Sequence, residues 1–237
     1  MKIELPTVEA RLIRRYKRFL TDVEMPSGEV LTAHCPNTGT LLGCVPEGAR
    51  TILRDSQDPR RKLRYTFQTV EVDGTWVNVD TSLPNTLVAE AIEGGQVPEL
   101  AGYEALQREV RYGASSRIDI LLSRGEAELC YVEVKSTTLA IAGEARFPDA
   151  VTARGKKHLD ELVSMVSEGH RAVIFFCVSR ADVERFAPAD DIDPLYGATL
   201  REAAAAGVEV LAYSTRVEPD RIELDARLEV SIPGFNG

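Results

Sequence analysis

Asp119 is followed fourteen residues later by the triplet Glu133-Val134-Lys135, a spacing that suits chemistry on a phosphodiester. Mg²⁺ prefers a few carboxylate oxygens, keeps several waters and takes its remaining ligands from phosphate. A cation held in this way activates water and stabilises negative charge, while a nearby lysine contacts the phosphate or helps to orient and deprotonate the water. The pattern therefore predicts a metal-dependent phosphodiesterase site.

The residues around these side chains predict a β-hairpin that brings them together. Residues 117–122 and 129–135 are short, apolar and rich in β-branched residues, and residues 123–126 have the composition of a turn. With the turn centred near the last of these residues, Asp119 lies opposite Glu133. Opposed side chains on antiparallel strands are about 4.5–5.5 Å apart, so the two carboxylates can share one cation.

The alternation of side chains along a strand sets the direction in which the triplet points. Glu133 and Lys135 face the same way, about 6.6–6.8 Å apart, while Val132 and Val134 face a core. An acid-x-Lys triplet is also common on solvated strand surfaces, where it has no catalytic role. The strand of Asp119 favours the functional interpretation, because a carboxylate among apolar neighbours needs a partner or a metal when it is buried.

Length and composition indicate a globular chain. It has 237 residues with 44% hydrophobic content, enough for one large domain or two smaller ones. No stretch approaches the roughly 18 consecutive apolar residues of a membrane span, and residues 1–6 lack the apolar core of a secretory signal. We therefore expect a cytoplasmic protein without a membrane partner.

His34, Cys35 and Cys44 lack the fourth ligand and the regular spacing of structural zinc.

The basic residues are concentrated in the first third of the chain. Residues 1–72 contain twelve Lys and Arg against nine Asp and Glu, a net of +3, which leaves −12 for the remainder of a chain whose total is −9. Such clusters suit contacts with nucleic-acid phosphates, although a solvated basic face has the same composition. The predicted nucleic-acid contacts in this region are Arg11, Arg14, Arg15, Lys17, Arg18, Arg61 and Lys62. The aromatic residues between them, which stack bases or pack in a core, are Tyr16, Phe19, Tyr65 and Phe67.

The pattern of expected elements changes near residue 82. About five short strands precede it, at residues 10–23, 29–34, 50–54, 63–72 and 75–80. They suit a small barrel, with an OB-type barrel favoured over an SH3-like one. Strands and helices then mix, with strands at 109–112, 117–123, 129–136, 172–179 and 208–213 and helices at 85–93, 152–167 and 194–206. We therefore predict a mixed α/β protein with an OB-like barrel over residues 1–82 and a helix-flanked mixed sheet over residues 83–237.

Two further segments carry weaker predictions. The expected helix over residues 152–167 places Arg154 and His158 on one face. Arg154 or Lys156 could contact the scissile phosphate, Arg in a bidentate manner and Lys as a point charge, or both could lie on a solvated face. His158 is interpreted as a structural or supporting residue, not as a metal ligand. The charged stretches at residues 190–193 and 221–230 are interpreted as solvated surface.

Several short segments spread over the chain carry a resemblance to a known family. They are Cys35-Pro36-Asn37-Thr38-Gly39, Leu83-Pro84-Asn85, Ser116-Arg117-Ile118-Asp119, Glu133-Val134-Lys135-Ser136, Phe147-Pro148-Asp149-Ala150-Val151-Thr152 and Arg154-Gly155-Lys156-Lys157-His158-Leu159. With these segments the chain resembles the sugar fermentation stimulation protein A (SfsA) family over essentially its full length. The resemblance implies an OB-like N-terminal domain, a second domain similar to PD-(D/E)XK nucleases, and a role in binding DNA.

The resemblance also implies roles for single residues. Asp119, Glu133 and Lys135 match the nuclease motif, with Asp119 and Glu133 as ligands of Mg²⁺ or Mn²⁺. Glu90 matches the helical glutamate that is often placed before this motif, where it would complete an acidic pocket. Asp119 follows Ile118 and not proline, a departure common among divergent members that keeps the carboxylate.

Three functions follow from these observations. The first is a DNA-binding protein with a Mg²⁺- or Mn²⁺-dependent nuclease-like site that hydrolyses phosphodiester bonds, with DNA a better expectation than RNA. The alternative is a DNA-binding regulator of sugar-metabolism genes that retains a nuclease fold without cutting. A carbohydrate enzyme, suggested by the family's name, ranks last because no sugar-enzyme motif or aromatic platform is recognised. The sequence leaves the oligomeric state open, a homodimer included.

Overall fold

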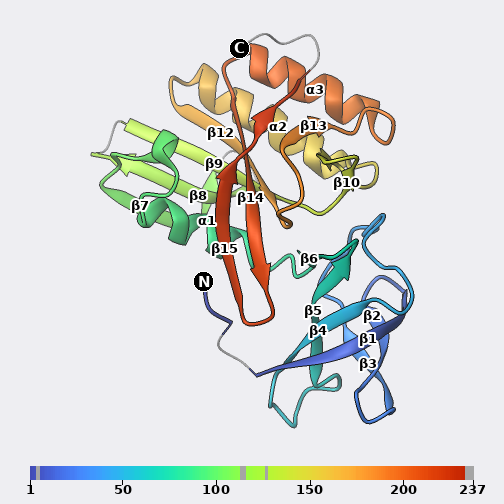
Figure 1. Ribbon diagram of the computed structural model, residues 1–237. Coiled ribbons are helices and arrows are strands. Elements are labelled where there is room, and N and C mark those ends of the chain that lie inside the picture. Colours follow the sequence, from blue (N-terminus) through green and yellow to red (C-terminus); the bar gives the residue numbers. More distant parts are fainter. Residues whose placement is uncertain (4–5, 113–115, 126–127, 233–237) are drawn as a thin grey trace.

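The computed structural model has two parts, a β-barrel and a larger sheet flanked by helices. In Figure 1 the barrel lies below the sheet. It describes residues 1–3, 6–112, 116–125 and 128–232. None of the helices in these ranges is long and apolar enough to cross a membrane.

Five strands of the first part close into a ring that has the OB-type order. Around the ring, β1 pairs with β2, β2 with β3, β3 with β5, β5 with β4 and β4 with β1. Inward side chains such as Leu12, Val23 and Phe67 fill the interior. β6 pairs with β5 outside the ring and leads to the second part. The strands are β1 (Thr7–Tyr16), β2 (Leu20–Glu24), β3 (Val30–His34), β4 (Arg50–Asp55), β5 (Tyr65–Val72) and β6 (Thr75–Asn78).

The single strand expected over residues 10–23 is two strands, which form the hairpin of β1 and β2. The turn between them contains Lys17 and Arg18, with φ angles of 48° and 63°. Side chains other than glycine adopt this left-handed region rarely, and the turn contains no glycine, proline or asparagine. The composition therefore gives no signal of the turn, and that prediction was wrong.

A mixed six-stranded sheet forms the centre of the second part, in the order β15-β14-β12-β9-β8-β7. β12 runs parallel to β9 and β14, and the other neighbouring pairs are antiparallel. β9 is therefore an inner strand, which places Glu133 in the middle of the sheet. The strands are β7 (Ala105–Tyr112), β8 (Ser116–Arg124), β9 (Glu128–Thr137), β12 (Arg171–Val178), β14 (Glu209–Glu218) and β15 (Arg221–Arg227).

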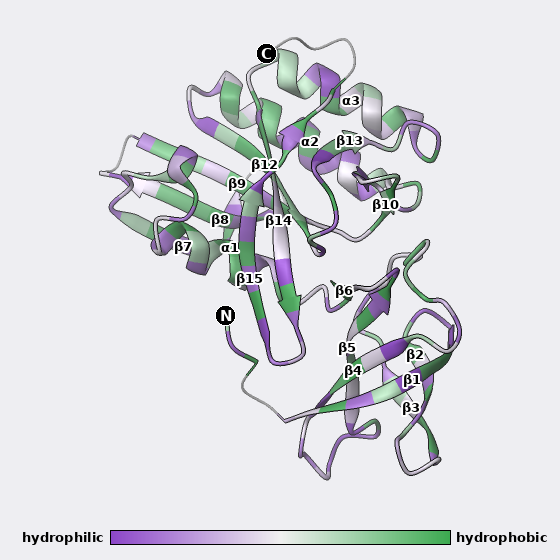
Figure 2. Cartoon of the chain, viewed as in Figure 1, coloured by the Kyte–Doolittle hydropathy of each residue, from purple (hydrophilic) through white to green (hydrophobic). Residues whose placement is uncertain are grey.

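Helices cover both faces of this sheet. α1 packs Leu87 and Val88 against one face, and α2 and α3 pack Leu159, Leu162 and Leu200 against the other. Hydrophilic and hydrophobic segments alternate along α2 and α3 in Figure 2, as expected of helices with one face towards a core. A small sheet of β10, β11, β13 and β16 lies beside them. The bounds are α1 (Pro84–Glu93), η1 (Pro98–Leu100), α2 (Ala153–Ser167), α3 (Pro194–Ala205), β10 (Ala140–Ile141), β11 (Glu144–Phe147), β13 (Arg185–Pro188) and β16 (Glu229–Val230).

The charged segments at residues 190–193 and 221–230 are partly buried, which corrects their assignment to solvated surface. Asp193 is 4% exposed and accepts a hydrogen bond of 3.0 Å from a backbone N–H in the first turn of α3. Ile222 and Leu224 alternate with charged residues along β15 and enter the core beneath α1. The charged residues occupy the outward positions of β15, an edge strand, and the apolar residues occupy the inward positions. The high charge content of the segment therefore gives no sign that one of its faces is buried.

The first residues of the chain belong with the second part, although the predicted barrel domain starts at residue 1. The Met1 amino group donates to the carbonyl of Ile222 at 2.9 Å, and Ile3 N donates to that of Asp220, also at 2.9 Å. The Ile3 side chain is buried in the core that contains α1. The chain thus begins on the second part and then crosses to the barrel.

A loop of the barrel, residues 35–41, contacts the second part through Asp149. The Asp149 carboxylate accepts hydrogen bonds from Thr40 Oγ1 at 3.0 Å and from Leu41 N at 2.9 Å. Gly39 lies against the same carboxylate, where an added Cβ would be 3.0 Å from Asp149 Oδ2. Two of the segments that carry the family resemblance therefore meet at this contact between the parts.

We expect Gly39→Ala to lower the free energy of unfolding by about 1–3 kcal/mol, because the new methyl group crowds the Asp149 carboxylate. The cost should be smaller in an Asp149→Ala background, where that carboxylate is absent. Urea denaturation of the two single variants and the double variant measures this coupling. Additive effects would contradict the close approach.

Candidate metal centre and nucleic-acid interface

The hairpin of β8 and β9 has the predicted register. Ile120 pairs with Val132, and the ladder continues from there towards the turn. The predicted turn centre at residue 126 lies outside the described residues. Extending the register by one residue sets Asp119 opposite Glu133, but the ladder ends at Ile120. The expected backbone pairing of Asp119 with Glu133 is therefore corrected. Beyond Ile120 it is the Asp119 carboxylate, and not a backbone carbonyl of β8, that accepts the hydrogen bond from Val134 N.

The Asp119 carboxylate is fixed by two donors. Val134 N donates to Oδ2 at 2.8 Å, and Asn85 Nδ2 donates to Oδ1 at 2.7 Å. Burial, together with the nearby negative charge of Glu133, raises the pKa of Asp119 to about 6. Asn85 comes from the first turn of α1 and was not among the predicted site residues. Its only sequence signal is its place in the segment Leu83-Pro84-Asn85.

Glu133 is 2% exposed and lies in the middle of the sheet. Its Oε1 accepts a hydrogen bond of 2.6 Å from Lys135 Nζ and also contacts His158 Nδ1. Its Oε2 is buried and has no hydrogen-bond partner among the described residues. Burial disfavours the charged form, but the His158 hydrogen bond and the Lys135 charge outweigh it and hold the pKa of Glu133 below its usual range. The carboxylate is therefore ionised, with one oxygen available.

Lys135, His158 and Arg154 form a row of contacting side chains that begins at this carboxylate. Lys135 Nζ is 3.0 Å from His158 Nδ1, and Arg154 Nε is 3.3 Å from His158 Nε2. His158 is 8% exposed, so it orients Lys135 and Glu133 from within the fold. These contacts suit the structural or supporting role that the sequence predicts for His158. The structure thus brings Asp119, Glu133 and Lys135 together at the end of the hairpin.

Asp119 and Glu133 match the needs of a hard divalent cation. No set of three or more His, Cys, Asp and Glu residues in the described ranges is placed to hold a metal. Two carboxylates are nevertheless enough for Mg²⁺, which keeps waters and completes its shell with substrate phosphate. The unpartnered Oε2 of Glu133 supports this fit, because a buried charged oxygen normally has a partner. These two residues would hold the ion.

The structure does not bring Glu90 to the carboxylate pair. Glu90 lies 3.5 Å from the Met1 amino group and lines a different pocket, with Arg54 and Thr86. Five residues separate it from Asn85, a rotation of about 140° around a helix of 3.6 residues per turn. Since Asn85 points to Asp119, Glu90 points elsewhere, and the prediction that it completes the acidic pocket is corrected.

An open pocket of about 560 Å³ lies in front of Asp119. Arg154 lines it, whereas Lys156 lies outside the lining and pairs with Asp160 at 2.7 Å. Of the two cations predicted to meet the scissile phosphate, Arg154 has the suitable position. The full lining is Asn85, Glu109, Ser116, Arg117, Asp119, Arg154, Lys157 and His158.

Arg15 is a structural residue of the barrel and not an exposed phosphate contact. Its guanidinium donates to four backbone carbonyls at 2.7–3.0 Å and to the Cys35 sulfur at 3.3 Å. Three of these carbonyls belong to the barrel loop (residues 35–41). Arg15 therefore fixes the shape of the loop that meets Asp149. The four carbonyls are those of Arg18, Asn37, Gly39 and Thr40.

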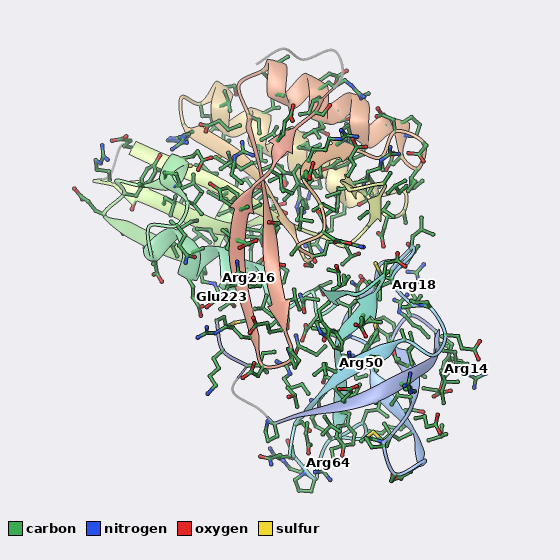
Figure 3. All side chains as sticks on the ribbon, viewed as in Figure 1. Arg14, Arg18, Arg50, Arg64, Arg216 and Glu223 are labelled. Carbon is green, nitrogen blue, oxygen red and sulfur yellow. The ribbon has the colours of Figure 1, made fainter. Side chains whose placement is uncertain are left out.

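The other predicted phosphate contacts of the barrel fall into two groups. Arg11, Arg14 and Arg61 hydrogen-bond to Gly48 O, the Asp22 carboxylate and Thr66 Oγ1 respectively. The side chains of Lys17, Arg18 and Lys62 are exposed and make no hydrogen bond or ion pair within the described ranges. Figure 3 shows Arg18 near the second part and Arg64 at the far end of the barrel, so the two basic clusters do not form one patch.

The fold and the site define a two-domain protein in which an OB-type barrel is attached to a mixed α/β domain, where two acids and a lysine meet at the end of a strand hairpin. The model of the SfsA N-terminal OB domain matches residues 13–79, and that of the sugar fermentation stimulation protein RE domain matches residues 82–221. The chain belongs to the sugar fermentation stimulation protein (SfsA) family.

Relatives of this family match nearly the whole chain. The sugar fermentation stimulation protein homolog of Geotalea uraniireducens is 54% identical, over 97% of this chain and 99% of its own. That of Thioalkalivibrio sulfidiphilus is 55% identical, over 98% of both chains. The solved structure of Pyrococcus furiosus SfsA in complex with Ca²⁺ has a TM-score of 0.88 and 30% identity, and the match covers 98% of each chain.

We expect the affinity for a divalent cation to fall as the pH decreases through about 6, because a proton then competes for Asp119. One competing proton gives a loss of about tenfold per pH unit below that value. Titration calorimetry with Ca²⁺ measures the affinity. Asp119→Asn should abolish binding at every pH, and a wild-type affinity independent of pH would contradict the assignment.

The same pKa has a consequence for the metal-free protein. An acid whose pKa is raised by folding favours the folded state while protonated, so its ionisation lowers stability as the pH rises from about 4 to about 6. Without metal, Asp119→Asn should therefore be at least as stable as the wild type at pH values near 7. A clear loss of melting temperature would show that the carboxylate stabilises the fold.

Arg15→Ala should lower the free energy of unfolding by about 2–4 kcal/mol, because it removes charged hydrogen bonds and leaves loop carbonyls without a donor. Arg14→Ala is the matched control. Arg14 lies on the same strand as Arg15, and its substitution removes an exposed ion pair with Asp22 of β2, which is worth less than about 1 kcal/mol. Equal effects of the two substitutions in urea denaturation would contradict the structural role of Arg15.

Proposed function

We propose that this protein is a DNA-binding nuclease that hydrolyses phosphodiester bonds with Mg²⁺ or Mn²⁺ held by Asp119 and Glu133. The observation that carries the proposal is the buried, ionised Glu133, whose Oε2 has no partner among the described residues and whose Oε1 is held by Lys135. A charged oxygen left available at this depth indicates a cationic ligand. Bound there, the cation would supply Lewis-acid stabilisation of a phosphate and a more acidic water.

The protein side chains then have separate tasks. Asp119 is held in place by Asn85 and Val134 N, which limits its motion when the ligand changes. Lys135 supplies a positive charge beside the carboxylates, where it can contact the phosphate or orient the attacking water. Arg154 lines the pocket in front of Asp119 and suits bidentate contact with a phosphate.

The relative from Pyrococcus furiosus supports a divalent cation, since its solved structure is a complex with Ca²⁺. Ca²⁺ and Mg²⁺ both take oxygen ligands and differ in coordination number and rigidity. Mg²⁺ and Mn²⁺ are proposed as the working ions because they complete a two-carboxylate site with water and phosphate. DNA is proposed as the partner because the barrel carries exposed basic residues next to the second domain.

A DNA-binding regulator that does not cut is the second candidate, and one observation favours it. Among the described residues no three acidic, His or Cys side chains are placed to hold a metal together, and Glu90, expected to add a third carboxylate, pairs with the N-terminus instead. A site of this kind could retain a cation for binding while lacking the charge needed for rapid hydrolysis.

The two candidates are separated by cleavage of labelled DNA in Mn²⁺, Mg²⁺ and EDTA. We expect cleavage that requires the metal and falls at least about 100-fold in Asp119→Asn, Glu133→Gln and Lys135→Ala. Glu90→Gln is the matched control and should leave the rate unchanged. Intact binding without cleavage under any condition would support the regulator, and cleavage that survives all three substitutions would indicate a different site or a contaminant.

A further inference from the structure

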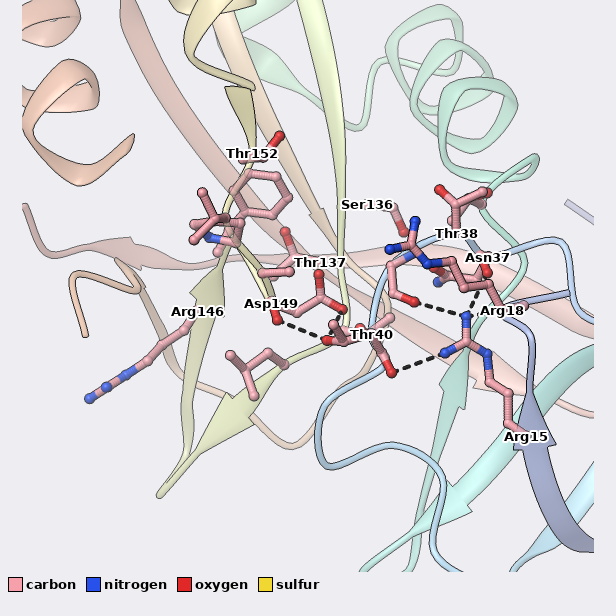
Figure 4. A pocket seen from close by; sticks show the side chains of 18 residues that line it. Arg15, Arg18, Asn37, Thr38, Thr40, Ser136, Thr137, Arg146, Asp149 and Thr152 are labelled. Carbon is pink, nitrogen blue, oxygen red and sulfur yellow. Dashed lines mark hydrogen bonds between the residues drawn. The ribbon is translucent and has the colours of Figure 1, made fainter. Parts of the chain in front are cut away.

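A second pocket, of about 630 Å³, lies between the barrel and the second domain. It is lined by the hairpin turn of β1 and β2, the barrel loop, the end of β9 and residues 146–152. Figure 4 shows this pocket, with side chains from both domains around it. Its volume is in the range of small-molecule sites, which suits one nucleotide better than a duplex.

The pocket is continuous in sequence with the metal centre along two elements. Ser136 and Thr137 line it and directly follow Lys135 on β9. Thr152 lines it and caps α2, whose Arg154 lines the pocket in front of Asp119. Lys135 and Arg154 therefore stand one and two residues along the chain from residues that line this pocket.

Two polar groups in the pocket lack protein partners. Thr137 is 1% exposed, and its Oγ1 is buried without a hydrogen bond in the described residues. The Arg18 guanidinium is exposed and unpaired within the same ranges, and Figure 4 shows it directed towards Thr38 and Ser136. Arg146 is directed away from these residues and hydrogen-bonds to Glu144. Arg18 is therefore the cation available to an anion in the pocket.

One large hydrophobic side chain of the pocket lining is exposed, and another follows a lining residue in the sequence. They are Val151 at 77% and Phe19 at 48%. Phe19 follows Arg18 in the hairpin turn, and Val151 is in the pocket lining. An exposed aromatic ring beside an unpaired arginine is the combination that binds single-stranded nucleic acid, through base stacking and phosphate contact.

We propose that this interdomain pocket binds one nucleotide of a single DNA strand, next to the phosphate held at the metal centre. Arg18 contacts the backbone phosphate, Phe19 stacks on the base, and Thr137 Oγ1 hydrogen-bonds to the nucleotide. The inference rests on the proposed function, which identifies the bound nucleic acid as DNA. It adds a single-strand preference and a binding path between the domains.

The test measures binding of a labelled single-stranded oligonucleotide by fluorescence anisotropy in Ca²⁺ over a series of salt concentrations, with cleavage in Mn²⁺ measured in parallel. Arg18→Gln should weaken binding and reduce the slope of log affinity against log salt by about 0.7, the value for one phosphate contact on a single strand. Phe19→Ala should weaken binding about tenfold through lost stacking. Arg14→Gln, on the same hairpin, should change neither. Equal melting temperatures establish that the variants are folded.

The outcomes separate this inference from the proposed function. If the wild type cleaves but Arg18→Gln and Phe19→Ala leave affinity, salt slope and KM unchanged, the pocket is not a nucleotide site and the nuclease stands. If the wild type binds without cleaving and both variants weaken binding, the nucleotide site stands and the nuclease fails. Tighter binding of duplex than of single strand, or displacement of the strand by submillimolar glucose 6-phosphate, would overturn the inference.

Discussion

The site depends on the burial of one carboxylate, that of Glu133, on an inner strand of the sheet. Transfer of an ionised carboxylate out of water is unfavourable unless the charge is compensated. Lys135 and His158 compensate one oxygen, and burial leaves the other without a partner among the described residues. The surrounding fold holds this arrangement in place, because strands flank β9 on both sides and helices cover both faces. A cation is the ligand that such an oxygen would stabilise most.

The contact between the two domains places the barrel next to this site. Arg15 shapes the barrel loop (residues 35–41), and Asp149 fixes that loop to the segment that precedes α2. α2 in turn carries Arg154 and His158 to the metal centre. Two of the segments that carry the family resemblance, residues 35–39 and 147–152, are therefore structural supports. They set the distance between a cationic turn of the barrel and the carboxylates of the second domain.

The sequence was sufficient where side-chain alternation and local composition determine the structure. The hairpin register and the helix that carries His158 both follow from such patterns. Predictions were wrong where tertiary contacts determine the direction in which a side chain points. Arg15 has the same local composition as Arg14 but points to loop carbonyls. Asn85, and not Glu90, lies beside Asp119, because the two residues are about 140° apart around α1 and the helix sequence does not specify which of them faces β8.

The central claim is that Asp119 and Glu133 hold a divalent cation, and anomalous diffraction from crystals grown with Mn²⁺ tests it most directly. We predict a peak bonded to Glu133 Oε2 and to the Asp119 carboxylate, with Lys135 still beside Glu133. The peak should disappear in Glu133→Gln crystals grown in the same way. A wild-type peak at other residues, or a Glu133 carboxylate that stays uncoordinated at high Mn²⁺ concentration, would contradict the account.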